Sequence, residues 1–170
     1  LKGEAQLAEI IPFIAPGVFQ DIRGSFTTDL NIYGSLKSPR FSGTLDLLDA
    51  GAYLPVTGAT IDDLLLRVSM SDDEIHLNKL FLKVGDGELN GTGLVGFERW
   101  QLEGYSLALH GELLHLYDFP ELQLFCGPDL TLSGDLTGAR VRGNILIQEM
   151  KLIDNTSKEE LLPSNDVVIS

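Results

Sequence analysis

The stretch LNIYGSLKSPRFSGTLDL, from Leu30 to Leu47, decides the fold, because it returns one hundred residues later as LTLSGDLTGARVRGNILI, from Leu130 to Ile147. In both copies apolar residues alternate with polar ones, and a short turn leads through an arginine into a second alternating run. Such alternation is typical of a β-strand with one apolar face. Each copy therefore predicts a β-hairpin, and the recurrence predicts a repetitive sheet whose units stack on their neighbours.

Short turns separate further alternating runs, so we expect nine or ten strands joined as an antiparallel meander. The run from residue 61 to 70 keeps one phase, whereas the apolar residues of 75–84 change phase near Asn78 and Lys79. That change predicts a β-bulge.

The N-terminal segment has a different period. Residues 4–14 carry Leu7, Ile10, Ile11 and Ile14 at helical spacing, and Pro12 limits the predicted helix to about two turns. We expect three parts, a helix and end plug over 1–23, a repetitive sheet over 24–154, and a polar linker with a short terminal strand over 155–170. We also expect the chain to be a fragment of a longer protein.

Composition excludes several classes of function. The formal net charge is −13 and the isoelectric point is near 4.4, so the surface repels nucleic-acid phosphates and offers no basic patch to an anionic membrane. The single cysteine, Cys126, cannot form an internal disulfide. No apolar run approaches the roughly 20 residues of a membrane-spanning helix.

The polar residues do not converge on a catalytic motif. The sequence has no nucleophile elbow, phosphate-binding loop or dinucleotide fingerprint. His110 and His115 are five residues apart on strand-like sequence, which places them on opposite faces of the strand. The acidic cluster of residues 72–74 falls at a turn, where Asp serves local backbone hydrogen bonds. We therefore expect no enzyme, no metal site and no cofactor.

The apolar stripe itself is the remaining candidate site. On periodicity alone a sandwich or closed barrel is favoured, in which two inner faces bury each other. The other interpretation is a sheet that curls without closing and leaves a groove. The residues that would line this groove are Phe26, Leu30, Ile32, Phe41, Leu45, Leu47, Leu64, Leu66, Val68, Met70, Leu80, Leu82, Val84, Leu89, Val95, Phe97, Leu107, Leu109, Leu130, Leu132, Val141, Ile145 and Ile147.

A family resemblance favours the open form. The hairpin YGSLKSPRFSGTLDLLDAGAYLP from Tyr33 to Pro55, its second copy from Leu130 to Ile153, the preceding LAEIIPFIAP and the closing ELLPSNDVVIS resemble the TamB-like proteins of the translocation and assembly module, within the AsmA-like group of bridge-type lipid carriers. In that family a short helix followed by G-x-L-x-x-P-x-x-x-G-x-L-x-L recurs through long repetitive chains. The second copy departs from the motif, because Gly138 and Ala139 stand in the turn in place of Pro39.

The resemblance implies a β-taco, an all-β antiparallel sheet folded into an open U-shaped half-barrel with a hydrophobic interior. It implies a periplasmic protein whose parent is anchored in the inner membrane and works with an outer-membrane barrel partner of the Omp85 type, similar to TamA. The implied role is a conduit that carries phospholipid acyl chains toward the outer membrane, or a scaffold that holds nascent outer-membrane barrel strands. The alternative is a closed β-sandwich spacer or adhesin-like module without cargo. The family has no catalytic residues to transfer.

Overall fold

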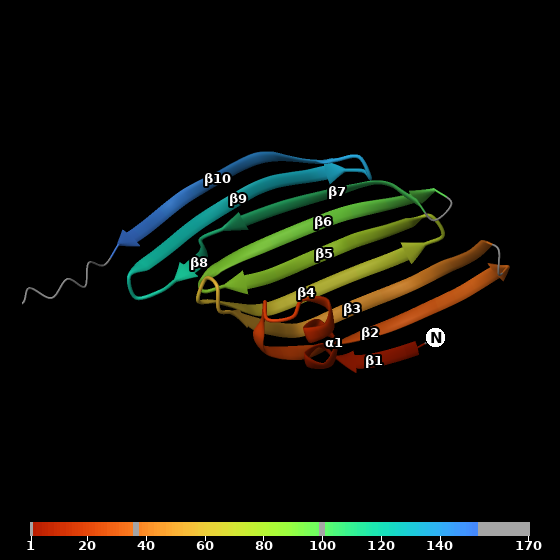
Figure 1. The fold of residues 1–170 in the computed structure, drawn as a ribbon, viewed down its shortest axis with the longest axis horizontal. Coiled ribbons are helices and arrows are strands. Elements are labelled where there is room, and N and C mark those ends of the chain that lie inside the picture. The colour runs from red at the N-terminus through yellow and green to blue at the C-terminus, as the bar shows by residue number, and fades with distance from the viewer. Residues whose placement is uncertain (1, 36–37, 99–100, 153–170) are drawn as a thin grey trace, which may run out of the picture.

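The chain forms one antiparallel sheet with one short helix (Figure 1). A computed structural model describes residues 2–35, 38–98 and 101–152. In this part of the chain the elements are β1 Lys2–Gln6, α1 Leu7–Ile14, β2 Gln20–Ser35, β3 Ser38–Leu54, β4 Ala59–Ser71, β5 Glu74–Val84, β6 Gly87–Glu98, β7 Gln101–Glu112, β8 Leu114–Asp118, β9 Leu122–Gly134 and β10 Ala139–Leu152.

The sheet is curved and open. Its spatial order is β1-β2-β3-β4-β5-β6-β7-β9-β10, and β8 pairs with β9 beside that path (Figure 1). Since β1 and β10 lie at opposite margins, the sheet does not close on itself. The predicted all-β antiparallel meander is confirmed, and the closed sandwich or barrel is wrong. The linker and terminal strand expected over 155–170 lie outside the described residues.

The N-terminal helix is shorter than predicted. Residues 7–14 are helical and include Pro12, but residues 2–6 form β1, so the helix expected over 4–6 is wrong. The physical reason is non-local, because β1 pairs antiparallel with β2 from Lys2 opposite Asp29 to Gln6 opposite Ser25. α1 then packs against β2 and β1, at this margin of the sheet.

The two copies of the repeat fold in the same register. Leu30 lies opposite Gly43 in the β2–β3 pair, and Leu130 lies opposite Gly143 in the β9–β10 pair. Both glycines have positive φ, 157° and 136°. A Cβ on Gly43 would collide with the carbonyl oxygen of Asp29, and one on Gly143 with that of Asp129. The recurrent hairpin is therefore confirmed down to the close contact of its backbones.

The second hairpin replaces Pro39 with a polar turn. The Asp135 carboxylate accepts hydrogen bonds from the backbone N–H of Thr137 at 2.7 Å and from that of Gly138 at 3.2 Å. The Thr137 hydroxyl also donates to this carboxylate, and its bond, ahead of the two backbone bonds, is the main cause that lowers the pKa of Asp135 below its ordinary value. Local side-chain bonding thus closes a turn that lacks the proline.

Bulges keep the apolar residues on one side of the sheet. In β5, Leu77 lies opposite Val68 and Lys79 opposite Arg67, so the extra residue is Asn78. The predicted bulge is confirmed. A bulge of this kind restores the alternation after a phase change, and both apolar runs of β5 face the same way.

At one end of the sheet the chain turns across the strands. Residues 117–128, which lack a clear alternation, include the end of β8 and the start of β9. β8 contacts β4, β5 and β6, and the Asp118 N–H donates to the Thr57 carbonyl oxygen at 2.9 Å. Between β8 and the sheet, Leu114 of β8 packs with Ala59 and Val84 to form the buried cluster of the described residues.

Substitution of the paired glycines should test the repeat. We expect Gly43→Ala or Gly143→Ala to lower the free energy of unfolding by about 2 to 4 kcal/mol, since each combines positive φ with a backbone collision. Gly138→Ala is the matched control within the second hairpin, because a Cβ there meets nothing within 4 Å. It should change stability by about 0.5 kcal/mol or less in urea titrations. Equal effects at positions 143 and 138 would contradict this account.

Candidate functional site

Three rows of uncharged residues cross the sheet at right angles to the strands. Each row has eight positions, and we call the three rows together the apolar face. Every step along a row is a cross-strand pair. The first row is Phe26, Leu47, Leu66, Leu80, Gly91, Leu109, Leu130 and Gly143; the second is Thr28, Leu45, Val68, Leu77, Gly93, Leu107, Leu132 and Val141; the third is Leu30, Gly43, Met70, Ile75, Val95, Tyr105, Gly134 and Ala139.

The opposite side of the sheet carries most of the charged and polar side chains, with Leu65, Phe81 and Leu94 among them. One row between the first two apolar rows begins Thr27, Asp46, Arg67 and Lys79, and the next polar row runs from Thr44 through Ser69, His76, Leu94, Ser106 and Ser133 to Arg140. Arg67 Nε donates to Asp46 at 2.8 Å. Because successive side chains of a strand point to opposite faces, the two kinds of row are separated by the backbone.

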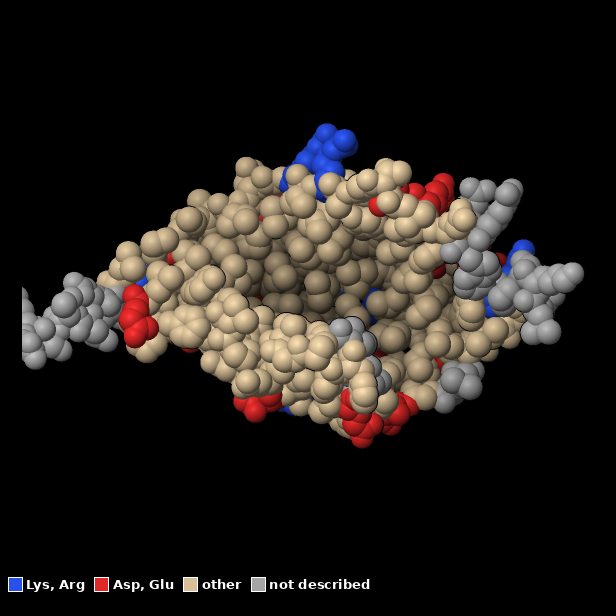
Figure 2. All heavy atoms as spheres, viewed as in Figure 1, with Lys and Arg blue, Asp and Glu red and all other residues tan. Residues whose placement is uncertain are grey.

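Side chains on the apolar face are only partly covered. Among the described residues six hydrophobic side chains are buried, and Leu47 at 6% exposure is the one in the three rows. The other large side chains of these rows are half-buried, except Val141 of β10, which is exposed. Figure 2 shows a hollowed face on which nearly all atoms are tan, with Asp and Glu at its margins. An uncovered apolar surface of this extent is typical of a binding surface.

Two glycines shape the middle of this face. Gly91 and Gly93 lie on β6 between leucines of β5 and β7. A Cβ on Gly91 would stand 2.9 Å from Leu109 Cδ2 and 3.1 Å from Leu80 Cδ2, so the leucine side chains lean over β6 from both sides. The glycines thus make room for neighbouring side chains.

The structure brings most of the predicted groove residues together. Fourteen of them occupy the three rows, and Ile32 and Phe41 face each other one step further along β2 and β3. Phe97 extends the β6 run opposite Leu102, while Ile145 and Ile147 continue the β10 run. Ile32, Ile145 and Ile147 are strongly exposed, at 66%, 59% and 58%.

Four predicted groove residues lie outside the three rows toward the other end of the strands, three of them at the end covered by β8. Val84 is buried there against Leu114, and Leu82 and Leu89 pack on the same cluster. Leu64 lies opposite the fully buried Ala50, next to a bulge at Asp63. These side chains contact protein atoms, so the uncovered surface ends before them.

The list of predicted groove residues leaves out several members of the apolar face. Ile75, Leu77 and Tyr105 complete the second and third rows. For Ile75 and Leu77 the phase change in β5 was the available signal, since a bulge places the apolar residues before and after it on the same side of the sheet. Leu114 carried no comparable signal, because its burial depends on strands distant in sequence.

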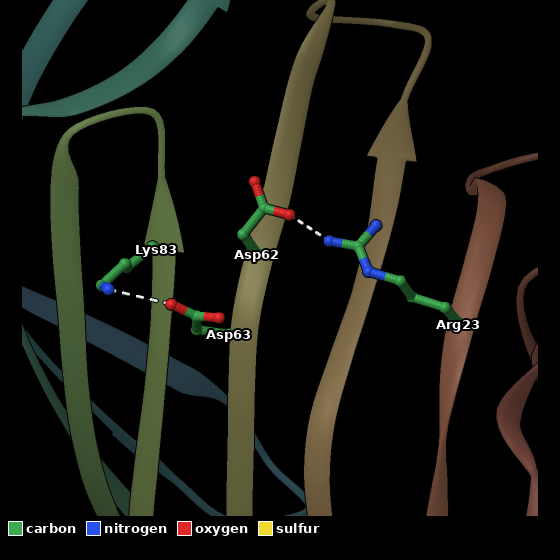
Figure 3. A network of polar contacts seen from close by, with 4 residues as sticks. All are labelled: Arg23, Asp62, Asp63 and Lys83. Carbon is green, nitrogen blue, oxygen red and sulfur yellow. Dashed lines mark hydrogen bonds and ion pairs between the residues drawn. The ribbon is translucent and has the colours of Figure 1, made fainter.

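Ion pairs link the strands on the polar side of the sheet, near the end that β8 covers. Figure 3 shows Arg23 of β2 reaching across β3 to Asp62 of β4, and Lys83 of β5 paired with Asp63. Gly51 permits the first contact, since a Cβ there would stand 2.6 Å from Arg23 Nη2. Lys83 Nζ donates to Asp63 at 2.8 Å, which raises the pKa of Lys83. Both pairs are solvent-exposed and contribute mainly to geometry.

The metal-ligating and nucleophilic side chains of the described residues are spread over the sheet rather than gathered at one place. Over residues 2–35, 38–98 and 101–152, no group of three or more His, Cys, Asp or Glu side chains is placed to hold a metal ion. His110 is exposed on the polar side, whereas His115 stacks on Phe125 with ring centroids 4.2 Å apart. Burial raises the pKa of the Cys126 thiol, which disfavours its reactive thiolate. α1 is the helix that the described residues contain, and it is too short to cross a bilayer.

The cluster under β8 gives a stability test. Leu114 is 3% exposed, and we expect Leu114→Ala to lower the free energy of unfolding by about 2 to 4 kcal/mol through lost burial and a residual cavity. Leu136→Ala is the control, because that leucine is 72% exposed and its truncation should cost about 0.5 kcal/mol or less. If urea unfolding responds equally to both, Leu114 does not pack as described.

Comparisons of the chain with protein-family models, with curated proteins and with solved structures found no match.

Proposed function

We propose that the curved sheet is a U-shaped half-barrel whose hydrophobic interior is the apolar face, and that this interior carries the acyl chains of phospholipids. The observation that supports the proposal is the set of three uncharged rows, which run through eight neighbouring strands and whose large side chains are mostly half-exposed. Neighbouring strands are about 4.8 Å apart, so seven steps give a track of roughly 34 Å. A track of that length suits an extended acyl chain.

The proposed mechanism is passive. An acyl chain displaces water from the rows of leucine, valine and isoleucine, and each buried methylene contributes about 0.8 kcal/mol. The polar head group remains at the open margin, where it stays in contact with solvent. Because apolar contacts are non-directional, we expect broad tolerance of acyl length and head group.

The wider role rests on the resemblance of the two hairpins to TamB-like proteins. We propose that the chain works in the bacterial periplasm as part of a protein anchored in the inner membrane, beside an Omp85-type barrel similar to TamA. In that setting the interior would guide phospholipids toward the outer membrane.

Paired aspartate substitutions should test the lipid site. Val68→Asp and Leu107→Asp place a charge in the second row, and we expect each to weaken binding of a fluorescent fatty acid, cis-parinaric acid, at least about tenfold, or about 1.4 kcal/mol. Their chain neighbours Ser69→Asp and Ala108→Asp point to the polar side and should bind as the parent does. Circular dichroism checks that all four variants fold.

Two results would overturn this proposal. Equal binding by Val68→Asp and Ser69→Asp would remove the apolar face as the lipid site. Unfolding of Val68→Asp and Leu107→Asp, with both polar-side variants intact, would make the face a closed core.

A second candidate cargo is an amphipathic strand of a nascent outer-membrane barrel protein. The observation that favours it is the spacing between the rows, which are two residues apart along each strand. Side chains on one face of a client strand have the same two-residue spacing, so they would match the rows. A synthetic strand with alternating leucines should displace cis-parinaric acid, whereas its scrambled isomer should not. Equal displacement by the two peptides would exclude this cargo.

A further inference from the structure

The two margins of the sheet differ. β1 is five residues long and has α1 beside it, whereas β10 runs for 14 residues and is paired through β9. Every residue of β10 is exposed. A long edge strand offers unpaired backbone N–H and C=O groups to another strand, while a short or covered edge does not.

The repeat shows what the β10 edge accepts. β10 occupies the place of β3 in the second hairpin, and β3 carries β4 on its other side. There Leu47 lies opposite Leu66 and is 6% exposed, whereas its counterpart Ile147 is 58% exposed. Among the described residues, the same unit thus has an antiparallel neighbour beside β3 and none on the outer side of β10.

We infer that two copies of this chain join through antiparallel pairing of β10 with β10. The pairing sets Arg140 opposite the partner's Glu149 and places Asn144 on the two-fold axis. The inference goes beyond lipid carriage and holds for a protein that binds no lipid.

Charge and polarity select this register. Gln148 is the bulged residue of β10, since Ile147 pairs with Cys126 and Glu149 with Phe125. With Asn144 on the axis, Val141 faces the partner's Ile147 and Gly143 faces the partner's Ile145 on the apolar side, and the bulge then brings Arg140 opposite the partner's Glu149. A two-residue slip in one direction would set Arg140 opposite the partner's Lys151, and a one-residue slip would set apolar against polar positions.

The joined sheet would keep both apolar faces on one side. A two-fold axis perpendicular to the sheet leaves the side of each face unchanged, so the rows of one copy continue into those of the other. Pairing would also cover Ile145 and Ile147, which stand exposed in one copy.

A charge exchange tests the register in the full 170-residue chain. We expect sedimentation velocity to show a concentration-dependent dimer at 0.15 M salt, and Arg140→Glu or Glu149→Arg to weaken it roughly tenfold or more by opposing like charges at two sites. The double variant Arg140→Glu with Glu149→Arg restores opposite charges and should restore the dimer.

Cysteine pairing gives an independent readout. Asn144→Cys should form a disulfide-linked dimer on mild oxidation, because the two-fold axis brings position 144 against itself. Thr131→Cys, exposed on the polar side of neighbouring β9, is the control and should stay unlinked. Native Cys126 is 2% exposed and should not react.

Several outcomes would overturn the inference. These are a monomer at every concentration without a cross-link at position 144, equal cross-linking at positions 144 and 131, or a dimer that neither charge variant weakens. Failure of the double variant to restore a dimer lost in both single variants would reject the proposed register.

Discussion

Pairing between neighbouring strands holds this sheet together, because little of the described chain is buried. Six hydrophobic side chains of the described residues are buried, and three of them belong to the cluster under β8. Elsewhere the stabilising contacts run between side chains on one face of adjacent strands. Register is therefore the main constraint, since a slip of one residue would move a whole strand's apolar side chains to the polar side. The bulges at Asn78 and Gln148 absorb extra residues without such a slip.

Long polar side chains reinforce this register by crossing a strand where a glycine makes room. Arg23 passes Gly51 of β3 to reach Asp62. Near the other margin the bulged Gln148 passes Gly127 of β9, and its Oε1 accepts a hydrogen bond at 2.9 Å from the N–H of Leu113. Leu113 has a φ of 52° and lies where β7 ends and β8 turns away. A glycine in the middle strand is thus the shared means of linking strands that are not neighbours.

The repeated hairpins and the apolar face could be predicted from the sequence because both follow from local alternation. The same principle explains the confirmed bulge in β5. It could not predict β1, whose residues 4–6 looked helical, because that strand forms against β2. Nor could it place Val84 under Leu114, since that contact joins segments thirty residues apart. The alternation also could not predict that the sheet is open, because apolar and polar residues alternate in the same way in a sandwich and in a single curved sheet.

The order of the strands has a consequence for how the molecule is made. From β1 to β7 each new strand lies beside the one before it, so the chain adds to a growing edge as it leaves the ribosome. Contacts that are close in sequence favour rapid assembly, since each loop to be closed is short. The exception is β9, which must pair with β7 after the excursion of β8. We therefore expect the last hairpin to arrive on a preformed template, late in synthesis, as the slow step of folding.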